Sequence, residues 1–366
     1  MSRSFYLLFI FFMSALLNEG LAQGPGTKLK WSELAPIPDH IGFAGSFAGV
    51  SNGALLVAGG ANFPDGGTPW TGSVKVWHHA IFALESTEGK WKEVGRLPYP
   101  LGYGASVSFN DALIIIGGSN ESGHRCEVLV LKYQHGKIEI SRLPDLPHPV
   151  ANTAAALVGN VIYVAGGIEK PDDKTTGKNF WALDLTAEEK GWKILDSWPG
   201  PSRMLSVTGA QRGSFYLFSG AELVDGVRKY LKDAYQYIPG TGWKQIMSLP
   251  DAVTAAPSPA YTAGDDQLLI FGGDDGKLAA NAASLNEKHP GFSTRILSYH
   301  AITNTWEVSG EIFTNRKSDA IAHPNNSIWA PVTTTLTVWK GNIVISGGEV
   351  RPATRTPNVL MATFEK

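Results

Sequence analysis

Apolar runs that end in a pair of small residues recur along the chain and predict a series of repeated β-strands. The first residues of these pairs stand at positions 59, 117, 166, 219, 272 and 347, so the spacings are 58, 49, 53, 53 and 75 residues. Short turns such as Ser51–Gly53 and Val158–Asn160 lead into the runs, and Asn and Gly favour hairpins because they accept positive φ. The pattern predicts six repeats of about 50 residues, with insertions in the two long intervals.

A second pattern alternates with the first and completes a four-stranded unit. After each small pair comes another strand, then a segment that opens with Trp and ends near Pro, and then a strand rich in small residues such as Gly102–Ser108. The Trp segments are Trp91–Pro98, Trp192–Pro199 and Trp243–Pro250, with a weaker version at Trp306 and a version without Trp at Ile138–Pro144. Small residues suit an innermost strand, and Trp suits the wider gaps between units.

The two ends of the chain predict a closed ring. The last segment, Val359–Phe364, has the pattern of a third strand, and the missing fourth strand matches Leu29–Pro36 near the N-terminus. An N-terminal strand that completes the last unit leaves no free sheet edge. We therefore expect an all-β, six-bladed β-propeller of the kelch type that occupies residues 23–366 as one domain.

The first residues have the composition of a secretory signal peptide. Arg3 precedes the apolar run Phe5–Met13, and Gly20 and Ala22 provide small residues for cleavage. The run is shorter than the roughly 20 residues that span a membrane. We expect residues 1–22 to be removed and the mature protein to be periplasmic or secreted, without a membrane segment.

Charge and cysteine content argue against several classes of function. The formal net charge is −2 and no basic stretch occurs, which disfavours nucleic-acid binding. Cys126 is the single cysteine, so no intramolecular disulfide or thiolate metal cluster can form, and we interpret it as a strand residue. His78 and His79 are adjacent and would point to opposite faces of a strand, so no metal site is expected.

Polar residues follow the small pairs, at the point where loops from all repeats reach the same face of the ring. Such convergence suits a small polar ligand in the channel mouth, although loops are commonly polar in any protein. These residues are Asn62, Asn120, Glu121, Glu169, Glu222, Asp274, Asp275, Glu349, Arg351 and Arg355, with Asp39, His40, Asn152 and Arg203 from the adjoining loops.

Three segments resemble the N-acetylneuraminate epimerases, or sialic acid mutarotases, a family of kelch-repeat propellers. They are Phe43–Gly60 with Ala61–Phe63, Tyr103–Gly118 and Gly347–Arg355. The resemblance implies interconversion of the α and β anomers of sialic acid without any cofactor. It also implies that Glu349 and Arg355 are the functional residues.

The chemistry of these two side chains agrees with that activity. A guanidinium binds a carboxylate through two parallel hydrogen bonds, and a carboxyl group can move the protons that ring opening requires. Arg351 could hold the carboxylate in place of Arg355, and Glu349 could instead form a structural ion pair. Further candidates for substrate contacts are Asn62, Tyr103, Arg203 and Glu222.

Other readings of the same pattern stay open. A non-catalytic lectin or protein-docking propeller would use the same loops. A sialidase would carry Ser-x-Asp-x-Gly-x-x-Trp boxes, which the sequence lacks, and a copper oxidase would need a Cys–Tyr cofactor, for which Cys126 is weak support. The insertions at 62–79 and 274–293 could cover the mouth or contact another subunit, and a homodimer is one possibility.

Overall fold

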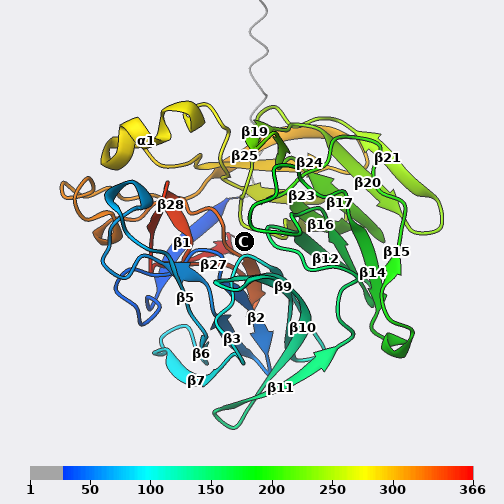
Figure 1. Ribbon diagram of the computed structural model, residues 1–366, viewed down its shortest axis with the longest axis horizontal. Helices are drawn as coiled ribbons and strands as arrows, with labels where there is room; N and C mark the ends of the chain where they lie inside the picture. Colours follow the sequence, from blue (N-terminus) through cyan, green and yellow to red (C-terminus); the bar gives the residue numbers. More distant parts are fainter. Residues whose placement is uncertain (1–27, 366) are drawn as a thin grey trace, which may run out of the picture.

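The computed structural model describes residues 28–365, so the predicted signal peptide lies outside the described residues. Within them the chain forms six four-stranded sheets arranged as the blades of a β-propeller (Figure 1). The predicted all-β, six-bladed architecture is confirmed. Blade 1 consists of β2 Phe47–Ser51, β3 Ala54–Ala58, β6 Ala80–Leu84 and β7 Lys92–Arg96. Blade 2 consists of β8 Ala105–Phe109, β9 Ala112–Asn120, β10 Gly123–Gln134 and β11 Lys137–Leu143. Blade 3 consists of β12 Ala154–Val158, β13 Val161–Ala165, β14 Phe180–Asp184 and β15 Lys193–Ile194. Blade 4 consists of β16 Val207–Gln211, β17 Ser214–Phe218, β20 Ala234–Ile238 and β21 Gly242–Ile246. Blade 5 consists of β22 Tyr261–Ala263, β23 Gln267–Phe271, β24 Arg295–His300 and β25 Thr305–Glu311. Blade 6 consists of β26 Leu336–Trp339, β27 Asn342–Ser346, β30 Val359–Phe364 and β1 Leu29–Leu34.

The N-terminal strand closes the ring. β1 pairs antiparallel with β30 from Leu29 opposite Phe364 to Leu34 opposite Val359. Because β30 also pairs with β27, the last blade has four strands drawn from both ends of the chain. This arrangement covers the sheet edge that an open array would expose, as the terminal patterns predicted.

Smaller elements occupy the connections between the second and third strands of several blades, all at one end of the ring. Three two-stranded hairpins are β4 Ala61–Asn62 with β5 Val76–Trp77, β18 Ala221–Val224 with β19 Val227–Tyr230, and β28 Glu349–Arg351 with β29 Thr354–Arg355. The same connections contain α1 Ala282–Leu285 and the 3₁₀ turns Pro69–Thr71, Ala279–Asn281 and Asn286–Lys288. Two further 3₁₀ turns lie elsewhere: Glu188–Lys190 connects the third and fourth strands of blade 3, and Pro324–Asn326 lies between blades 5 and 6. We find no helix in residues 28–365 that is long and apolar enough to cross a membrane.

The hydrophobic core is divided among the gaps between neighbouring blades. Each of six buried clusters joins two adjacent sheets; one, for example, packs Leu56 of blade 1 against Leu113 of blade 2, and another packs Phe43 and Leu55 of blade 1 against Val344 of blade 6. The alternate side chains of a strand therefore face different neighbours. Burial on both faces explains why the second strands read as continuous apolar runs.

The outermost strands are joined by a repeated tryptophan contact. The indole Nε1 of Trp243 donates to the carbonyl of Asp196 in the preceding blade at 2.7 Å, and Trp192 donates to Pro144 at 2.8 Å. The same contact links Trp91 to Ala35, Trp306 to Met247 and Trp31 to Glu311. Blade 2 has Ile138 at this position, which packs instead against the cluster between blades 1 and 2. The tryptophans are thus explained by the architecture.

Candidate functional site

Six residues, one in the segment that precedes each inner strand, form a closed ring of backbone hydrogen bonds at the mouth of the channel. Each amide donates to the carbonyl of the corresponding residue in the preceding blade, over 2.7–2.8 Å. All six have left-handed backbone conformations, with φ between 53° and 66°. We name this ring the girdle; its members are Gly45, Tyr103, Asn152, Leu205, Ala255 and Thr333. Non-glycine residues pay about 1–2 kcal/mol each for this conformation, so the girdle holds its side chains in geometry imposed by the whole ring.

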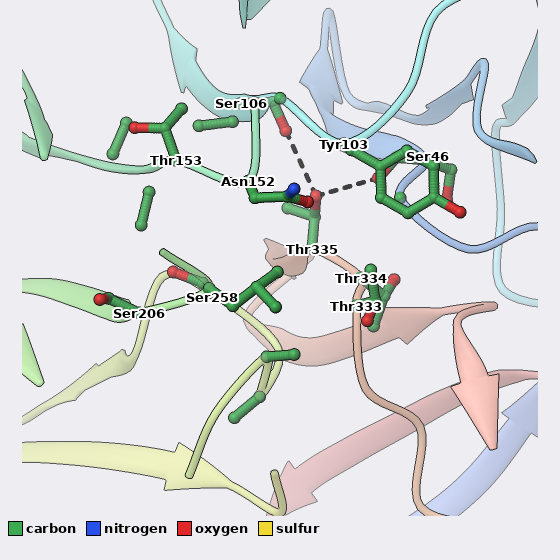
Figure 2. A pocket seen from close by; sticks show the side chains of 18 residues that line it. Ser46, Tyr103, Ser106, Asn152, Thr153, Ser206, Ser258, Thr333, Thr334 and Thr335 are labelled. Atoms are coloured by element: carbon green, nitrogen blue, oxygen red, sulfur yellow. Dashed lines mark hydrogen bonds between the residues drawn. The ribbon is translucent and has the colours of Figure 1, made fainter. Parts of the chain in front are cut away.

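A small cavity lies along the channel beside the girdle (Figure 2). Its volume is about 70 Å³ and its wall carries the hydroxyls of Ser106 and Thr335, which lie 3.4 Å apart. Ligand pockets for small molecules are typically ~300–1,000 Å³, so this cavity can hold water but not a sugar. A ligand the size of a sugar would need space outside the girdle, such as the side where the loops converge.

Glu349 and Arg355 lie together on that side, on the hairpin β28–β29. The hairpin follows Gly347 and Gly348, whose φ angles are 65° and 112°; a Cβ on Gly348 would lie 2.7 Å from the carbonyl oxygen of Val332. Glu349 and Arg355 are partners in the strand register. Their side chains approach to 3.5 Å between Glu349 Oε2 and Arg355 Nη1.

Arg355 is held by several further contacts and is only 4% exposed. Its Nη2 donates to the hydroxyl of Tyr103 at 3.3 Å, and its Nε donates to the carbonyl of Ala61 at 3.4 Å. The guanidinium also lies 4.7 Å from the centre of the Phe63 ring. Nη1, the nitrogen nearest Glu349, is buried and makes no hydrogen bond among residues 28–365, so one donor of the fork is not satisfied by a protein hydrogen bond.

Lys75 brings a second cation to the same place. Its ammonium lies 4.5 Å from the centre of the Trp77 ring and 4.8 Å from that of Tyr103. Burial and the nearby Arg355 lower the pKa of Lys75, and Glu349 opposes that effect. Burial likewise raises the pKa of Tyr103, so its phenol stays protonated at neutral pH. We refer to Lys75, Tyr103, Glu349 and Arg355 as the mouth cluster.

Two larger cavities adjoin the mouth cluster. One, of about 430 Å³, is lined by Arg355 together with Phe63 and His323. The other, of about 510 Å³, is lined by Glu349 together with Tyr230 and Phe292. Both volumes fall in the range of small-molecule sites, so the acid and the guanidinium each border space large enough for a sugar.

The two insertions meet beside these cavities. The indole Nε1 of Trp70, in the insertion of blade 1, donates to the amide oxygen of Asn286 in the insertion of blade 5 at 2.7 Å. His289, on the second insertion, is buried, and burial lowers its pKa. Residues 216 positions apart in the sequence thus connect over one side of the mouth.

The structure places the other sequence-predicted residues in different surroundings. Arg351 is buried, and its guanidinium donates to the carbonyls of Glu287 and Ile321. It therefore fastens two loops together, which leaves Arg355 better placed to meet a ligand. Glu222 is half-buried on β18 and lies 3.8 Å from Lys229 of β19, and its role as a substrate contact stays a prediction.

Arg203 and Asn62, two predicted substrate contacts, are buried and bonded to other parts of the protein. Arg203 is fully buried; it donates to a carboxylate oxygen of Asp233 at 2.6 Å and to the carbonyl of Ser219 at 3.0 Å. Asn62 is 1% exposed and bonds to the carbonyl of Gly42 and to the ring of His78. Both side chains have protein partners and offer no surface to a ligand.

Cys126 and potential metal ligands are the remaining side chains that the sequence raised as candidates. Cys126 packs at the edge of the cluster between blades 2 and 3, and burial raises the pKa of its thiol, which disfavours a reactive thiolate. Over residues 28–365 we find no group of three His, Cys, Asp or Glu side chains arranged to hold a metal ion.

Sequence reasoning missed Lys75 and Phe63 as parts of the site. Both lie in the insertion that follows the first small pair, for which the sequence predicted a substrate contact only at Asn62. The available signal was a lysine, Lys75, two positions before an aromatic residue, Trp77, in an inserted loop. Only the fold shows that this loop reaches Tyr103 and Arg355.

Comparison with known proteins identifies relatives of this chain. A sequence model of the N-acetylneuraminate epimerases matches residues 20–140 and 143–287. N-acetylneuraminate epimerases of Yersinia pestis (strain Pestoides F) and Salmonella enteritidis PT4 are 37% identical over 145 residues and 42% identical over 108 residues. These matches cover 35% and 26% of this chain, and only 35% and 28% of the relatives' own lengths.

A solved structure, "Structure of YjhT", shares the fold. Its TM-score is 0.64 at 16% identity, and the match covers 91% of this chain and 99% of that one. Since the family model spans most of the sequence, the chain belongs to the N-acetylneuraminate epimerase family.

Proposed function

We propose that this protein is a mutarotase that interconverts the α and β anomers of N-acetylneuraminic acid. The proposal is supported by the family membership and by the Glu349–Arg355 pair beside sugar-sized cavities. The pair is the observation that carries it, because a reaction of an anomeric centre that bears a carboxylate needs an acid–base group next to an anion-binding group.

Arg355 binds the carboxylate of the substrate. Its guanidinium is fixed by Tyr103 and Ala61 while Nη1 is without a hydrogen bond among residues 28–365. A fixed guanidinium loses little conformational freedom when a ligand arrives, so more of the interaction appears as affinity. Because the carboxylate of a sialic acid is attached to its anomeric carbon, this contact brings that carbon close to Glu349.

Glu349 moves the protons. Its carboxylate removes the proton of the anomeric hydroxyl; the bond from the anomeric carbon to the ring oxygen breaks, its electron pair stays on the ring oxygen, and that oxygen takes up a proton. The open-chain ketone then rotates and closes on its other face, and the protons return in reverse order. General acid–base catalysis of this kind contributes roughly 10²–10⁴-fold.

A non-catalytic sugar-binding propeller is the main alternative, and proton NMR separates the two. The α anomer is dissolved freshly and the growth of the β-anomer signals is followed with and without protein. The mutarotase predicts faster approach to the same equilibrium mixture. Binding that leaves the exchange rate at its spontaneous value would contradict the proposal and support a lectin.

We further propose that the protein acts outside the cytoplasm after residues 1–22 are removed. The proposal is supported by the charge and apolar pattern of that segment. N-terminal sequencing of protein recovered from the extracytoplasmic fraction should begin near residue 23. An uncleaved chain that stays in the cytoplasm would contradict it.

A further inference from the structure

The charges of the mouth cluster do not balance. Arg355 lies 3.5 Å from Glu349, whereas Lys75 has no carboxylate within 4 Å among residues 28–365. Its neighbours are the faces of Trp77 and Tyr103. In the described part of the chain, Arg355 and Glu349 are also the charged groups that act most strongly on Lys75. The mouth cluster therefore carries two cations and one carboxylate, an excess of one positive charge.

This arrangement costs free energy unless an anion arrives. Lys75 is partly withdrawn from water and lies near another cation, and both effects disfavour its charged form. Two aromatic faces attract an ammonium through their ring quadrupoles, but they are weaker acceptors for its N–H groups than a carboxylate would be. A ligand with one negative charge would neutralise the excess and supply the missing acceptor.

We propose that Lys75 binds the substrate's carboxylate together with Arg355, so that the mouth selects sugar acids with a single negative charge next to the anomeric carbon. This inference rests on the proposed function and adds the residue that sets charge selectivity. The insertion of blade 1 thereby contributes a binding group from the hairpin β4–β5, in addition to any covering role.

The simpler alternative is that Lys75 only fastens the hairpin β4–β5 to the rim of the channel. Its ammonium over the Tyr103 ring would then hold the hairpin in place. That role would make Lys75 important for every ligand, whether charged or not. Binding selectivity between a carboxylate and its uncharged ester separates the two readings.

The experiment measures affinity for two ligands that cannot turn over. The methyl α-glycoside of N-acetylneuraminic acid keeps its carboxylate, and the methyl ester of that glycoside has none; neither ring can open. Calorimetric titration compares the wild type with Lys75→Met, which keeps the stem of the side chain, and with Lys75→Arg, which keeps the charge. Lys340→Met is the matched control. The ammonium of Lys340 also lies over a tryptophan ring, 5.4 Å from the centre of Trp339. Lys340 is in the turn between β26 and β27, at the other end of the ring.

We expect Lys75→Met to weaken binding of the acid tenfold or more and to leave binding of the ester within twofold of the wild type. Lys75→Arg should retain most of the affinity for the acid, and Lys340→Met should bind both ligands like the wild type. An equal loss for acid and ester, or no loss for the acid, would overturn the inference while leaving the mutarotase proposal standing. A wild-type protein that binds neither ligand and does not accelerate anomer exchange would contradict both.

Discussion

Glu349 and Arg355 face each other across the hairpin β28–β29, with 3.5 Å between a carboxylate oxygen and a guanidinium nitrogen. Their separation of six residues in the sequence becomes a direct pairing because the turn at Pro352 and Ala353 reverses the chain; Ala353 has a φ of 63°. Backbone hydrogen bonds between Glu349 and Val332 fasten the hairpin next to the girdle residue Thr333. The acid–base group and the anion-binding group are therefore positioned by the same short element.

Replacement of Arg355 by lysine tests the role of the guanidinium fork. Arg355→Lys keeps the charge but loses the planar array of donors, so we expect the KM for N-acetylneuraminic acid to rise about tenfold or more, with a smaller change in kcat. Arg351→Lys is the comparison, because Arg351 bonds to loop carbonyls. We expect Arg351→Lys to loosen the insertion and to weaken binding of the acid and of its ester alike. A larger selective loss for the acid in Arg351→Lys would transfer carboxylate binding to Arg351.

The pH dependence of binding follows from the lowered pKa of Lys75. Burial and Arg355 make its ammonium lose the proton below the ordinary lysine pKa of 10.5. Affinity for the acid should therefore fall as the pH rises through that lowered pKa, because a neutral amine no longer attracts the carboxylate. In Lys75→Arg the guanidinium stays charged, so this alkaline decline should disappear. Identical pH profiles for the two proteins would contradict the assignment.

The contact between Trp70 and Asn286 predicts that the insertions support each other. Trp70→Phe removes the indole donor that reaches Asn286 and keeps an aromatic ring. A lost hydrogen bond of this kind costs about 1 kcal/mol, so amide hydrogen exchange in residues 274–293 should accelerate roughly fivefold while exchange in the blades stays unchanged. Unchanged exchange in the insertion would show that the contact contributes nothing in solution.

The tryptophan contacts between outer strands predict a measurable stability term. Trp243→Phe deletes the hydrogen bond to the carbonyl of Asp196 and part of the packing against Phe180, whose ring centre lies 4.6 Å away. We expect a loss of about 1–2 kcal/mol in the free energy of unfolding, measured by urea denaturation. Trp70→Phe, on an exposed insertion, serves as the control and should change the free energy of global unfolding by about 0.5 kcal/mol or less.

The fold could be predicted from the sequence because its signals are local and repeated. Apolar runs, small pairs and tryptophans recur in each unit, and the incomplete last unit matched the spare strand at Leu29–Leu34. The irregular parts were harder. The girdle depends on left-handed backbone at Leu205 and Thr333, which no local propensity favours; the closure of the ring imposes it.

The site could be predicted only in part, since position after a small pair indicates the end of the blade but not the depth of a side chain. Asn62 follows such a pair, and Arg203 lies in an adjoining loop, yet both point into the protein and bond there. Glu349 and Arg355 were predicted because the segment Gly347–Arg355 resembles the epimerase family. Lys75 was missed because its approach to Tyr103 depends on how an insertion folds over another blade.

The most direct test of the account compares anomer exchange in the wild type and in Glu349→Gln, an isosteric change that keeps a polar amide. Proton NMR from freshly dissolved α anomer gives the rate, and binding of the methyl α-glycoside confirms that the site is intact. Glu93→Gln, on the exposed outer strand β7, controls for the substitution itself. We predict wild-type rates for Glu93→Gln and a loss of about 10²-fold or more, down to the spontaneous rate, for Glu349→Gln; full acceleration by Glu349→Gln would contradict the mechanism.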